Sequence, residues 1–593
     1  IFDIDFDPAI GSKSLKIQGL QGNNVNILID GIPVIGRKDS QIDLSQIDLS
    51  NIDRVEILKG PASVSYGTNS TGGVINLISK KIKTNQVRLN SYFETIGIHK
   101  ISIGANKYLN NPNSNSKFNL NNINLNLGNY SFLGVDNNEV RSQDWKSKNQ
   151  YFGDISFQFN LKKINFLFKK SLFNEKIVEL GDEQFFPNIG KAFDYHYLTL
   201  RDNNYLKLHR SSETYELYII SSYSKTKFLK EQYEVNLLLD SIVQTDSEEY
   251  NTEDIYSSFY NRLEFNYLKW NRIKLQAGID LYNDFAEGSK LKNDQNMRIN
   301  VYSFFSQTNI KITNLLETQI GLRIPYHSIY TSPFIPSFQF KYDILPRLQL
   351  RFSFAKGFRA PTMQELYMEF VDNSHNIIGN SNLEPEQSNS FQSSIDYVLI
   401  EGKNRFLSFN IEGFFNDLSN KIDLAELQES DAFTYFNMDD VRYYGLNTSL
   451  KSNFLIGDNI ASQFNIMWNM FKNDDSVFEY KTNQHAFSVF YSYEYNLCDC
   501  GFYINWKLKS KHDFYRLDED QNLVIDSQEG YQLLNSTFFK KFPKIKSSLH
   551  FGIKNMFDVR DIKDSKQENT HAGPVSIISW GRTYFIQLNW NPF

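Results

Sequence analysis

From residue 83 to the end of the chain, apolar and polar residues alternate in short runs. In one run, apolar side chains occupy every second position and polar ones lie between them: Leu348, Leu350, Phe352 and Phe354. Residues 487–496 and 502–509 have the same pattern. Successive side chains of a β-strand point to opposite faces. The pattern therefore predicts a long series of strands, each with one apolar and one mostly polar face.

The connections between these strands are expected to alternate in length. Short ones are predicted near 343–346, 401–404, 455–459, 497–501 and 541–546, and long ones near 356–388, 422–440, 472–484, 510–530 and 559–581. A β-sandwich would alternate too, but with its polar faces outside and similar loops at both ends. Short turns at one end and long loops at the other are typical of membrane β-barrels, whose interior is wet. At roughly 23 residues per strand and connection, residues 83–593 predict a membrane β-barrel of about 22 antiparallel strands.

Residues 1–82 have a different pattern. Short apolar runs are predicted to be strands at 25–29, 54–58 and 74–78, and Asp30-Gly31, Gly60-Pro61 and Gly72-Gly73 interrupt or precede them as turn signals. A barrel of about 22 strands typically has a plugged lumen. We therefore expect residues 1–82 to form an N-terminal α+β plug domain inside a barrel of residues 83–593.

Composition narrows the class of protein. The 593 residues carry a net charge of -6, which argues against a nucleic-acid partner, and 15% are aromatic, which favours strands. No run of about 18 apolar residues predicts a membrane-spanning helix. The two cysteines, Cys498 and Cys500, are only two residues apart, so we expect them to be unbonded turn residues. Because the chain starts at Ile1 without a signal peptide, we expect that a leader preceded it.

Several motifs resemble those of the TonB-dependent outer-membrane receptor family. In the plug they are Leu28–Val34, Arg54–Ser63, Ser65–Gly67 and Gly72–Asn76, and in the barrel they are Gly357–Pro361, Asn380–Glu386, Lys554–Asp558 and the strand after Gly581-Arg582. The two central barrel motifs look like the FRAP and NPNL boxes of the family. The signature residues of the plug are Asp30, Gly31, Arg54, Glu56, Lys59, Gly60, Pro61, Tyr66, Gly67, Gly72 and Gly73.

The resemblance implies a place in the outer membrane of a Gram-negative bacterium, surrounded by lipid. It implies active import of an iron complex, bound by extracellular loops and the plug apex, with energy delivered by TonB together with ExbB and ExbD. The TonB box of the family is not present in the sequence and would precede Ile1. We expect no enzyme, because Gly-x-Ser-x-Gly and His-Glu-x-x-His motifs do not occur, and no required cofactor.

The segment between the two boxes offers candidate ligand-binding residues. Heme receptors of the family carry an axial histidine in this interval, and His375 occupies it here, with Tyr367, Phe370 and Asp372 nearby. Imidazole binds iron well. The resemblance therefore implies heme as a possible ligand with His375 as a possible metal ligand, although a surface histidine in an Asn-rich loop would look the same.

Other ligands and partners stay open. The plug apex, near residues 35–43, contains no histidine but has Arg37 and Lys38, which favour anionic oxygens and hence a ferric siderophore. Residues 43–46 also resemble plugs of the cobalamin subgroup, so cobalamin uptake is an alternative. A surface receptor that works with a partner lipoprotein is another.

Two further sets of charged residues have both a functional and a simpler explanation. Asp518, Asp520, Asn522, Asp526 and Glu529 follow the spacing of a calcium-binding loop, although Leu523 replaces its glycine and an acidic solvated loop explains them equally. In the plug, Arg54, Glu56 and Lys59 are expected either to form ion pairs with carboxylates of the barrel wall or to pack within the plug.

Overall fold

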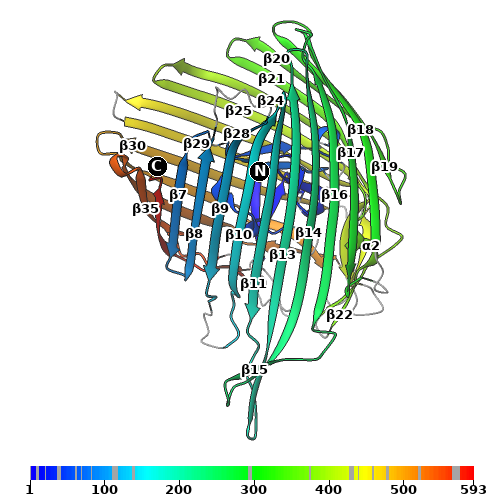
Figure 1. The fold of residues 1–593 in the computed structure, drawn as a ribbon, viewed down its shortest axis with the longest axis vertical. Coiled ribbons are helices and arrows are strands. Elements are labelled where there is room, and N and C mark those ends of the chain that lie inside the picture. The colour runs from blue at the N-terminus through cyan, green and yellow to red at the C-terminus, as the bar shows by residue number, and fades with distance from the viewer. Residues whose placement is uncertain are drawn as a thin grey trace.

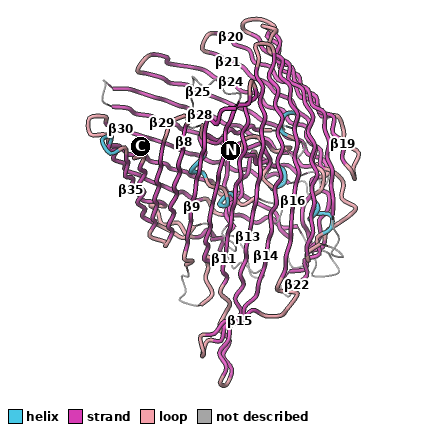
Figure 2. The backbone as a smooth tube through the Cα atoms, viewed as in Figure 1, coloured by secondary structure: helices cyan, strands magenta, loops and turns pink. Residues whose placement is uncertain are grey.

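The computed structural model describes residues 2–7, 12–20, 22–35, 42–60, 63–67, 70–81, 83–109, 118–135, 141–291, 297–372, 375–426, 433–438, 440–456, 460–475, 480–517, 523–563, 575–577 and 579–592. Most of these residues form one closed barrel of antiparallel strands, and the N-terminal segment, in blue, lies inside it (Figure 1). The described helices are few and short (Figure 2).

The barrel has twenty-two wall strands, and two short strands, β12 (Gln184–Phe186) and β15 (Ser241–Gln244), extend its hairpins. The last wall strand pairs with the first, with Leu588 opposite Ser91, so the sheet closes. The prediction of a 22-strand barrel is confirmed. The wall strands are β7 (Gln86–Glu94), β8 (Ile98–Tyr108), β9 (Phe118–Phe132), β10 (Ser147–Leu161), β11 (Ile164–Glu179), β13 (Ile189–Ser211), β14 (Tyr215–Asn236), β16 (Thr252–Tyr267), β17 (Ile273–Gly288), β18 (Met297–Lys311), β19 (Leu316–His327), β20 (Ile335–Leu345), β21 (Leu348–Arg359), β24 (Glu386–Gly402), β25 (Arg405–Ser419), β28 (Val441–Ile456), β29 (Ile460–Asp475), β30 (Tyr480–Tyr495), β31 (Cys500–Lys509), β34 (Tyr531–Phe542), β35 (Ser547–Lys554) and β38 (Thr583–Trp590).

Burial along a single strand explains why the sequence alternates. In β19, Ile320, Leu322 and Ile324 are exposed on the outer face, whereas Gly321 and Arg323 are buried on the inner face. A guanidinium would cost about 2–4 kcal/mol against lipid at mid-depth, so it belongs inside. The alternation in the sequence therefore reflects an apolar outer face and a polar inner face on the same strand.

The two ends of the barrel differ. One end, here called the short-turn end, has tight connections such as 346–347 and 403–404; the other, the long-loop end, carries segments such as 360–385 and 510–530. One length prediction is wrong: the connection predicted at 472–484 is short, because β29 continues to Asp475 and β30 starts at Tyr480. Both strands extend into polar residues, Lys472–Asp474 and Lys481–Asn483, which pair with each other although they show no apolar alternation.

The plug is built around a four-stranded sheet in the order β4 (Ile32–Pro33), β3 (Val25–Ile29), β6 (Gly73–Ser79) and β5 (Ile52–Lys59). β3 and β6 run parallel, and the other pairs are antiparallel. A short α1 (Ser63–Tyr66) joins β5 to β6, and three single-turn 3-10 helices complete the unit: η1 (Gly22–Asn24), η2 (Leu44–Gln46) and η3 (Leu49–Asn51). The hairpin β1 (Phe2–Asp7) and β2 (Ser12–Ile17) precedes it. The plug core consists of Ile17, Val25, Ile27, Ile42, Ile47, Ile75 and Leu77.

Two long loops join into one small sheet at the long-loop end. After β21, α2 (Met363–Tyr367) leads into β22 (Glu369–Asp372) and β23 (His375–Ile378), and β23 pairs with β27 (Phe433–Met438), which pairs with β26 (Lys421–Glu426). Two other loops form hairpins, β32 (His512–Leu517) with β33 (Leu523–Gln528) and β36 (Asp561–Lys563) with β37 (Val575–Ile577). Within the described ranges, no helix is long and apolar enough to cross a membrane.

The cysteines correct one expectation. Cys498 and Cys500 form a disulfide in a turn at the short-turn end. Their Cα atoms are 5.3 Å apart, within the normal range for a disulfide, and Asp499 between them has a left-handed φ of 49°. The tight turn therefore brings together two residues that an extended chain would keep apart.

Candidate ligand-binding cavity and plug contacts

The two barrel boxes meet in a buried ion pair at the long-loop end. Arg359 Nη2 lies 2.5 Å from Glu386 Oε1, and Arg359 Nη1 lies 2.9 Å from Glu365 Oε2. Burial alone would raise the pKa of Glu365, but the attraction of Arg359 and the hydrogen bonds that the carboxylate accepts outweigh it and hold this pKa below its usual range. The pair fixes the start of loop 360–385 to the first residue of β24.

Glu365 also organises α2 and links it to the plug. Thr362 Oγ1 accepts a hydrogen bond from Glu365 N at 3.2 Å, and Glu365 Oε2 accepts one from Thr362 N at 2.7 Å, which is a capping box. Asn23 Nδ2 of the plug donates to Glu365 Oε1 at 3.1 Å. The loop that connects the two boxes is therefore bonded directly to the plug.

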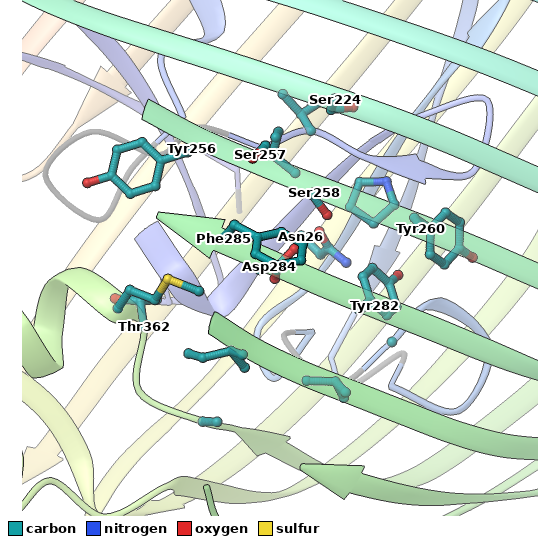
Figure 3. A pocket seen from close by; sticks show the side chains of 18 of the residues that line it. Asn26, Ser224, Tyr256, Ser257, Ser258, Tyr260, Tyr282, Asp284, Phe285 and Thr362 are labelled. Atoms are coloured by element: carbon teal, nitrogen blue, oxygen red, sulfur yellow. The ribbon is translucent and has the colours of Figure 1, made fainter. Parts of the chain in front are cut away.

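A cavity of about 200 Å³ lies between the plug, the barrel wall and this loop (Figure 3). The strand register explains its wall. One row of inward residues runs Ser224, Ser258, Asp284 and Ile299 across β14, β16, β17 and β18, and a second row runs Ser222, Tyr260, Tyr282, Val301 and His327 as far as β19. The plug contributes Asn26, Pro33, Val34, Ile35 and Gly67, and the loop contributes Ala360–Gln364. This space is called the upper cavity below.

The upper cavity combines hydroxyl groups with apolar surface. The rings of Tyr260 and Tyr282 are 4.5 Å apart, and Tyr260 OH donates to Asp280 Oδ1 at 3.3 Å. The Ser258 hydroxyl bonds to Asp284, and Figure 3 shows both among the cavity residues on neighbouring wall strands. Ligand pockets are typically about 300–1,000 Å³. A space of this size would enclose one compact part of a larger ligand.

The Asp30-Gly31 signature fixes a turn of the plug. Asp30 accepts hydrogen bonds from Ser79 N at 2.9 Å and from Ser79 Oγ at 2.6 Å, and Gly31 N donates to Asn76 Oδ1 at 2.9 Å. Lys169 Nζ of the wall lies 3.8 Å from Asp30. The turn after β3 is therefore hydrogen-bonded to β6 and also faces a wall cation.

The charged signature residues behave in two ways. Lys59 Nζ lies 2.7 Å from Glu412 Oε1 of the wall, whereas Arg54 Nη2 lies 2.6 Å from Glu56 Oε1 on the same plug strand. Of the three, Lys59 is bonded to a wall carboxylate, and Arg54 and Glu56 are bonded to each other.

The other signature residues occupy tight positions. Gly73 has a φ of 134°, and a Cβ atom there would lie 2.5 Å from Leu58 O, so no other residue fits without a shift. Tyr66 O accepts from Asn26 Nδ2 at 3.2 Å, and burial raises the pKa of the Tyr66 phenol. Gly60 and Gly67 also have positive φ, Gly72 packs against Leu20, and Pro61 lies outside the described residues.

On another part of the wall, η2 binds β10, β11 and β13 through side chains. Gln46 Nε2 donates to Glu175 Oε1 at 2.7 Å and its Oε1 accepts from Arg201 Nη2 at 2.9 Å. Lys148 Nζ lies 3.5 Å from Asp43 Oδ2. This contact depends on the identity of plug side chains.

The predicted ligand residues are only partly placed. Tyr367 lies on α2, beside the cluster that contains Met363, a residue of the upper cavity. Phe370, Asp372 and His375 lie in the β22–β23 hairpin, at whose tip Asp372 pairs with His375, but their side chains are outside the described part of the structure. Arg37 and Lys38 fall wholly outside it.

The predicted calcium site is not placed either. Asp518, Asp520 and Asn522 lie outside the described residues, Asp526 is described only as backbone in β33, and Glu529 is exposed. Among the residues that the structure does describe, no group of three or more His, Cys, Asp or Glu side chains is arranged to hold a metal.

Sequence reasoning missed the wall of the upper cavity. Tyr256, Tyr260, Tyr282 and Asp284 sit at inward positions of ordinary alternating strands. Their alternation predicts that they face the lumen, but nothing local tells at which height or opposite which plug segment. The register of five wall strands decides both the height of these residues in the lumen and the plug segment that they face.

Comparison with known families gives the class of protein. Residues 62–556 match the family model for the TonB dependent receptor-like beta-barrel, and residues 2–74 match the TonB-dependent Receptor Plug Domain. The chain belongs to the TonB-dependent receptor family.

Its curated relatives are distant. The ferric enterobactin receptor of Pseudomonas aeruginosa is 22% identical over 478 residues, which cover 70% of this chain and 62% of that receptor. The vitamin B12 transporter BtuB of Vibrio cholerae is 23% identical over 419 residues, which cover 69% of this chain and 61% of the transporter. The chain thus spans about three fifths of the length of these relatives.

Solved structures share the fold. The siderophore receptor PirA from Acinetobacter baumannii superposes with a TM-score of 0.75 at 17% identity, covering 100% of this chain and 94% of PirA. A mutant of the Pseudomonas aeruginosa ferric enterobactin receptor in complex with enterobactin gives 0.76 at 15%, covering 100% and 95%. The copper transporter OprC gives 0.74 at 13%, covering 100% and 94%. At these identities the likeness establishes the architecture.

Proposed function

We propose that this protein imports a ferric siderophore across the outer membrane of a Gram-negative bacterium, with energy from TonB, ExbB and ExbD. The observation that carries the proposal is the upper cavity, which lies between the plug, the barrel wall and the loop that connects the two family boxes. In this orientation the long-loop end faces the outside and the short-turn end faces the periplasm.

The cavity suggests how a bound ligand reaches the plug. A ligand group between Tyr282 and Pro33 touches the wall and the plug at once, so binding changes the surroundings of the plug strands β3 and β4. Loop 360–385 senses the same event through the bond from Asn23 to Glu365. The rest of the ligand would lie against the long loops, because the cavity is smaller than an ordinary ligand pocket.

The names of the relatives favour a siderophore but leave a second cargo. A ferric enterobactin receptor and a vitamin B12 transporter match this chain over similar shares and at similar identity. Cobalamin is therefore the second candidate. Heme with His375 as its ligand, a bound calcium ion and a partner lipoprotein stay predictions.

Uptake by cells tests the proposal. The receptor is expressed in a Gram-negative host without its own iron-complex receptors, and cells are offered ferric enterobactin, a ferric trihydroxamate, heme or cobalamin, with and without TonB. We expect TonB-dependent uptake of at least one of the two ferric siderophores. Cobalamin or heme uptake alone would replace the proposed cargo, and accumulation without TonB would contradict active import.

A cavity variant tests the site. Asp284→Asn keeps the size of the side chain but removes its charge in the upper cavity, so we expect a changed apparent affinity for the imported complex: stronger for an anionic complex, because repulsion is lost, and weaker for a cationic one. Glu213→Gln, at an exposed position in the turn between β13 and β14 at the short-turn end, is the control and should leave uptake unchanged. Equal affinities of wild type and Asp284→Asn for every complex would remove the cavity from the binding site.

A further inference from the structure

A second, larger cavity lies under the plug toward the short-turn end. It has a volume of about 770 Å³ and is bounded by Ile57–Lys59 of plug strand β5 and by the inner faces of β17 to β25. One row of paired residues crosses its wall: Lys274, Asn309, Gln319, Gln339, Ser353 and Gln392. This space is called the lower cavity.

The two cavities share the wall strands β17, β18 and β19. On β19, His327 belongs to the upper cavity and Gln319 to the lower one. At about 3.4 Å per residue, the eight steps between them measure about 27 Å along the strand. Three rows of inward residues fill this interval, and on β19 they are Gly321, Arg323 and Pro325.

The plug segment that lies against these rows is α1. Within the plug, α1 follows Lys59, which borders the lower cavity, and precedes Gly67, which borders the upper one. Val64 packs with Ile335, Phe358 and Ala360 of the wall and loop. A Cβ atom at Gly321 would lie 3.0 Å from Val64 Cγ1, so the wall glycine leaves room for this side chain. One turn of helix thus separates the two cavities along this stretch of wall.

Two wall arginines hold α1 by its backbone. Arg323 Nη1 donates to Val64 O at 3.1 Å, and Arg262 Nη1 donates to Ser65 O at 2.8 Å. Asp280 Oδ2 lies 2.7 Å from Arg323 Nη2, and Asp280 Oδ1 lies 3.7 Å from Arg262 Nη1. These guanidiniums are almost fully buried, so the wall keeps two charged donors ready for carbonyl groups whatever side chains the plug carries.

Ser65 adds one bond through its side chain. Its hydroxyl donates to Gln307 Oε1 at 2.8 Å. Displacement of α1 would therefore break three hydrogen bonds and one apolar contact, while the paired strands β3 and β6 of the plug would stay intact.

We propose that the imported substrate passes from the upper to the lower cavity along β17–β19 through the space that α1 occupies, and that Arg262 and Arg323 form the latch of this gate. The inference rests on the import function proposed above. It names a local path: α1 moves away from the wall, and the substrate enters the lower cavity beside β5 without removal of the whole plug.

Conductance tests the gate without any substrate. The purified full chain is placed in planar lipid bilayers as wild type, as Val64→Gly/Ser65→Gly and as a matched plug variant, Ser45→Gly/Gln46→Gly in η2. Loss of the Val64 contact and of the Ser65 bond should raise the open fraction about tenfold or more over wild type. The η2 variant should stay as closed as wild type. Equal conductance of the two variants, or no channel opening by either, would overturn the proposal.

A reversible lock tests the gate during transport. A Cβ atom at position 321 would lie 3.6 Å from Val64 Cβ, within the Cβ–Cβ range of a disulfide, so Val64→Cys/Gly321→Cys can bond α1 to β19. Because that Cβ would also lie 2.5 Å from Ser337 Oγ, the cysteine variant also carries Ser337→Ala. Ser337→Ala alone is the control. Uptake of ferric enterobactin should be lost in the oxidised form and return on reduction.

The outcomes separate the two proposals. Uptake by the oxidised, fully bonded variant would overturn the gate. Absence of uptake by wild type for every cargo would count against the import function, and the conductance of the α1 and η2 variants would still decide whether α1 closes a path. If Val64→Gly/Ser65→Gly does not assemble, the cysteine lock alone decides.

Discussion

The plug touches the barrel wall in two chemically different ways. At η2, side chains of the plug such as Gln46 reach into a network with Glu175 and Arg201. At α1, wall arginines hold backbone carbonyls, and a cavity lies on either side. The first contact is specific for plug residues, so it suits an anchor. The second combines arginine bonds to the plug backbone with the side-chain contacts of Val64 and Ser65, so it suits a part that separates and returns.

The largest expected effect comes from the latch arginine. Arg323→Ala leaves Asp280 as a buried carboxylate with a weaker partner, and breaking such a pair costs about 3–5 kcal/mol. We expect this loss in the free energy of unfolding, measured by denaturant titration in detergent micelles. The double variant Asp280→Asn/Arg323→Gln should recover part of it, and a double variant that is less stable than Arg323→Ala would contradict the coupling.

A smaller effect is expected at the anchor. Glu175→Gln removes a charge that accepts hydrogen bonds from Gln46 and Gln150, and such bonds are worth about 1.5–3 kcal/mol. Hydrogen exchange of backbone amides should become faster at residues 43–47 and stay unchanged at 63–66. Faster exchange at both places would mean that the two contacts are one cooperative unit, and the comparison would fail.

Acid should weaken the loop that joins the plug near the upper cavity. The folded-state pKa of Glu365 lies below its ordinary value of 4.5, so its carboxylate stabilises the fold above that pH, and this contribution is lost as the pH falls toward the folded-state pKa. We expect wild type to lose more thermal stability than Glu365→Gln between pH 7 and pH 4. Equal losses measured by calorimetry would show that Glu365 is not the titrating group.

The smallest effect is expected at Lys59. Its ion pair with Glu412 is partly exposed, with side-chain exposures of 29% and 15%, so Lys59→Gln should cost about 0.2–1 kcal/mol. Salt should reduce the difference between wild type and variant, as measured by thermal unfolding at low and high ionic strength. An effect as large as that of Arg323→Ala would make Lys59 part of the latch.

Much of the fold was predictable because each strand carries its own information. In β19 the alternation of Ile320, Gly321, Leu322 and Arg323 is imposed by lipid on one face and water on the other. It can therefore be recognised in the sequence of this strand alone. The three predicted plug strands were found, as β3, β5 and β6. The Cys498–Cys500 bond was not predictable, because it depends on the exact shape of one turn.

The candidate site was less predictable. The two boxes lie at the end of β21 and before β24, the thirteenth and fourteenth wall strands, but the reason for their residues, the pairing of Arg359 with Glu386, required two strands to lie side by side. Tyr282 and Asp284 could be assigned to the lumen and no further. Their neighbours in space come from five strands and from a plug segment some 250 residues earlier in the chain.

The sequence by itself predicted the barrel and the plug, because lipid, water and tight turns impose local patterns of residue type at fixed spacing, and its motifs carried the resemblance to the family. Only the tertiary structure decided which lumen residues form the upper cavity, which plug turn separates it from the lower one, and which arginines hold that turn. The physical reason is register. A shift of two residues between β18 and β19 would keep every alternation in the sequence. It would still move Arg323 away from Val64.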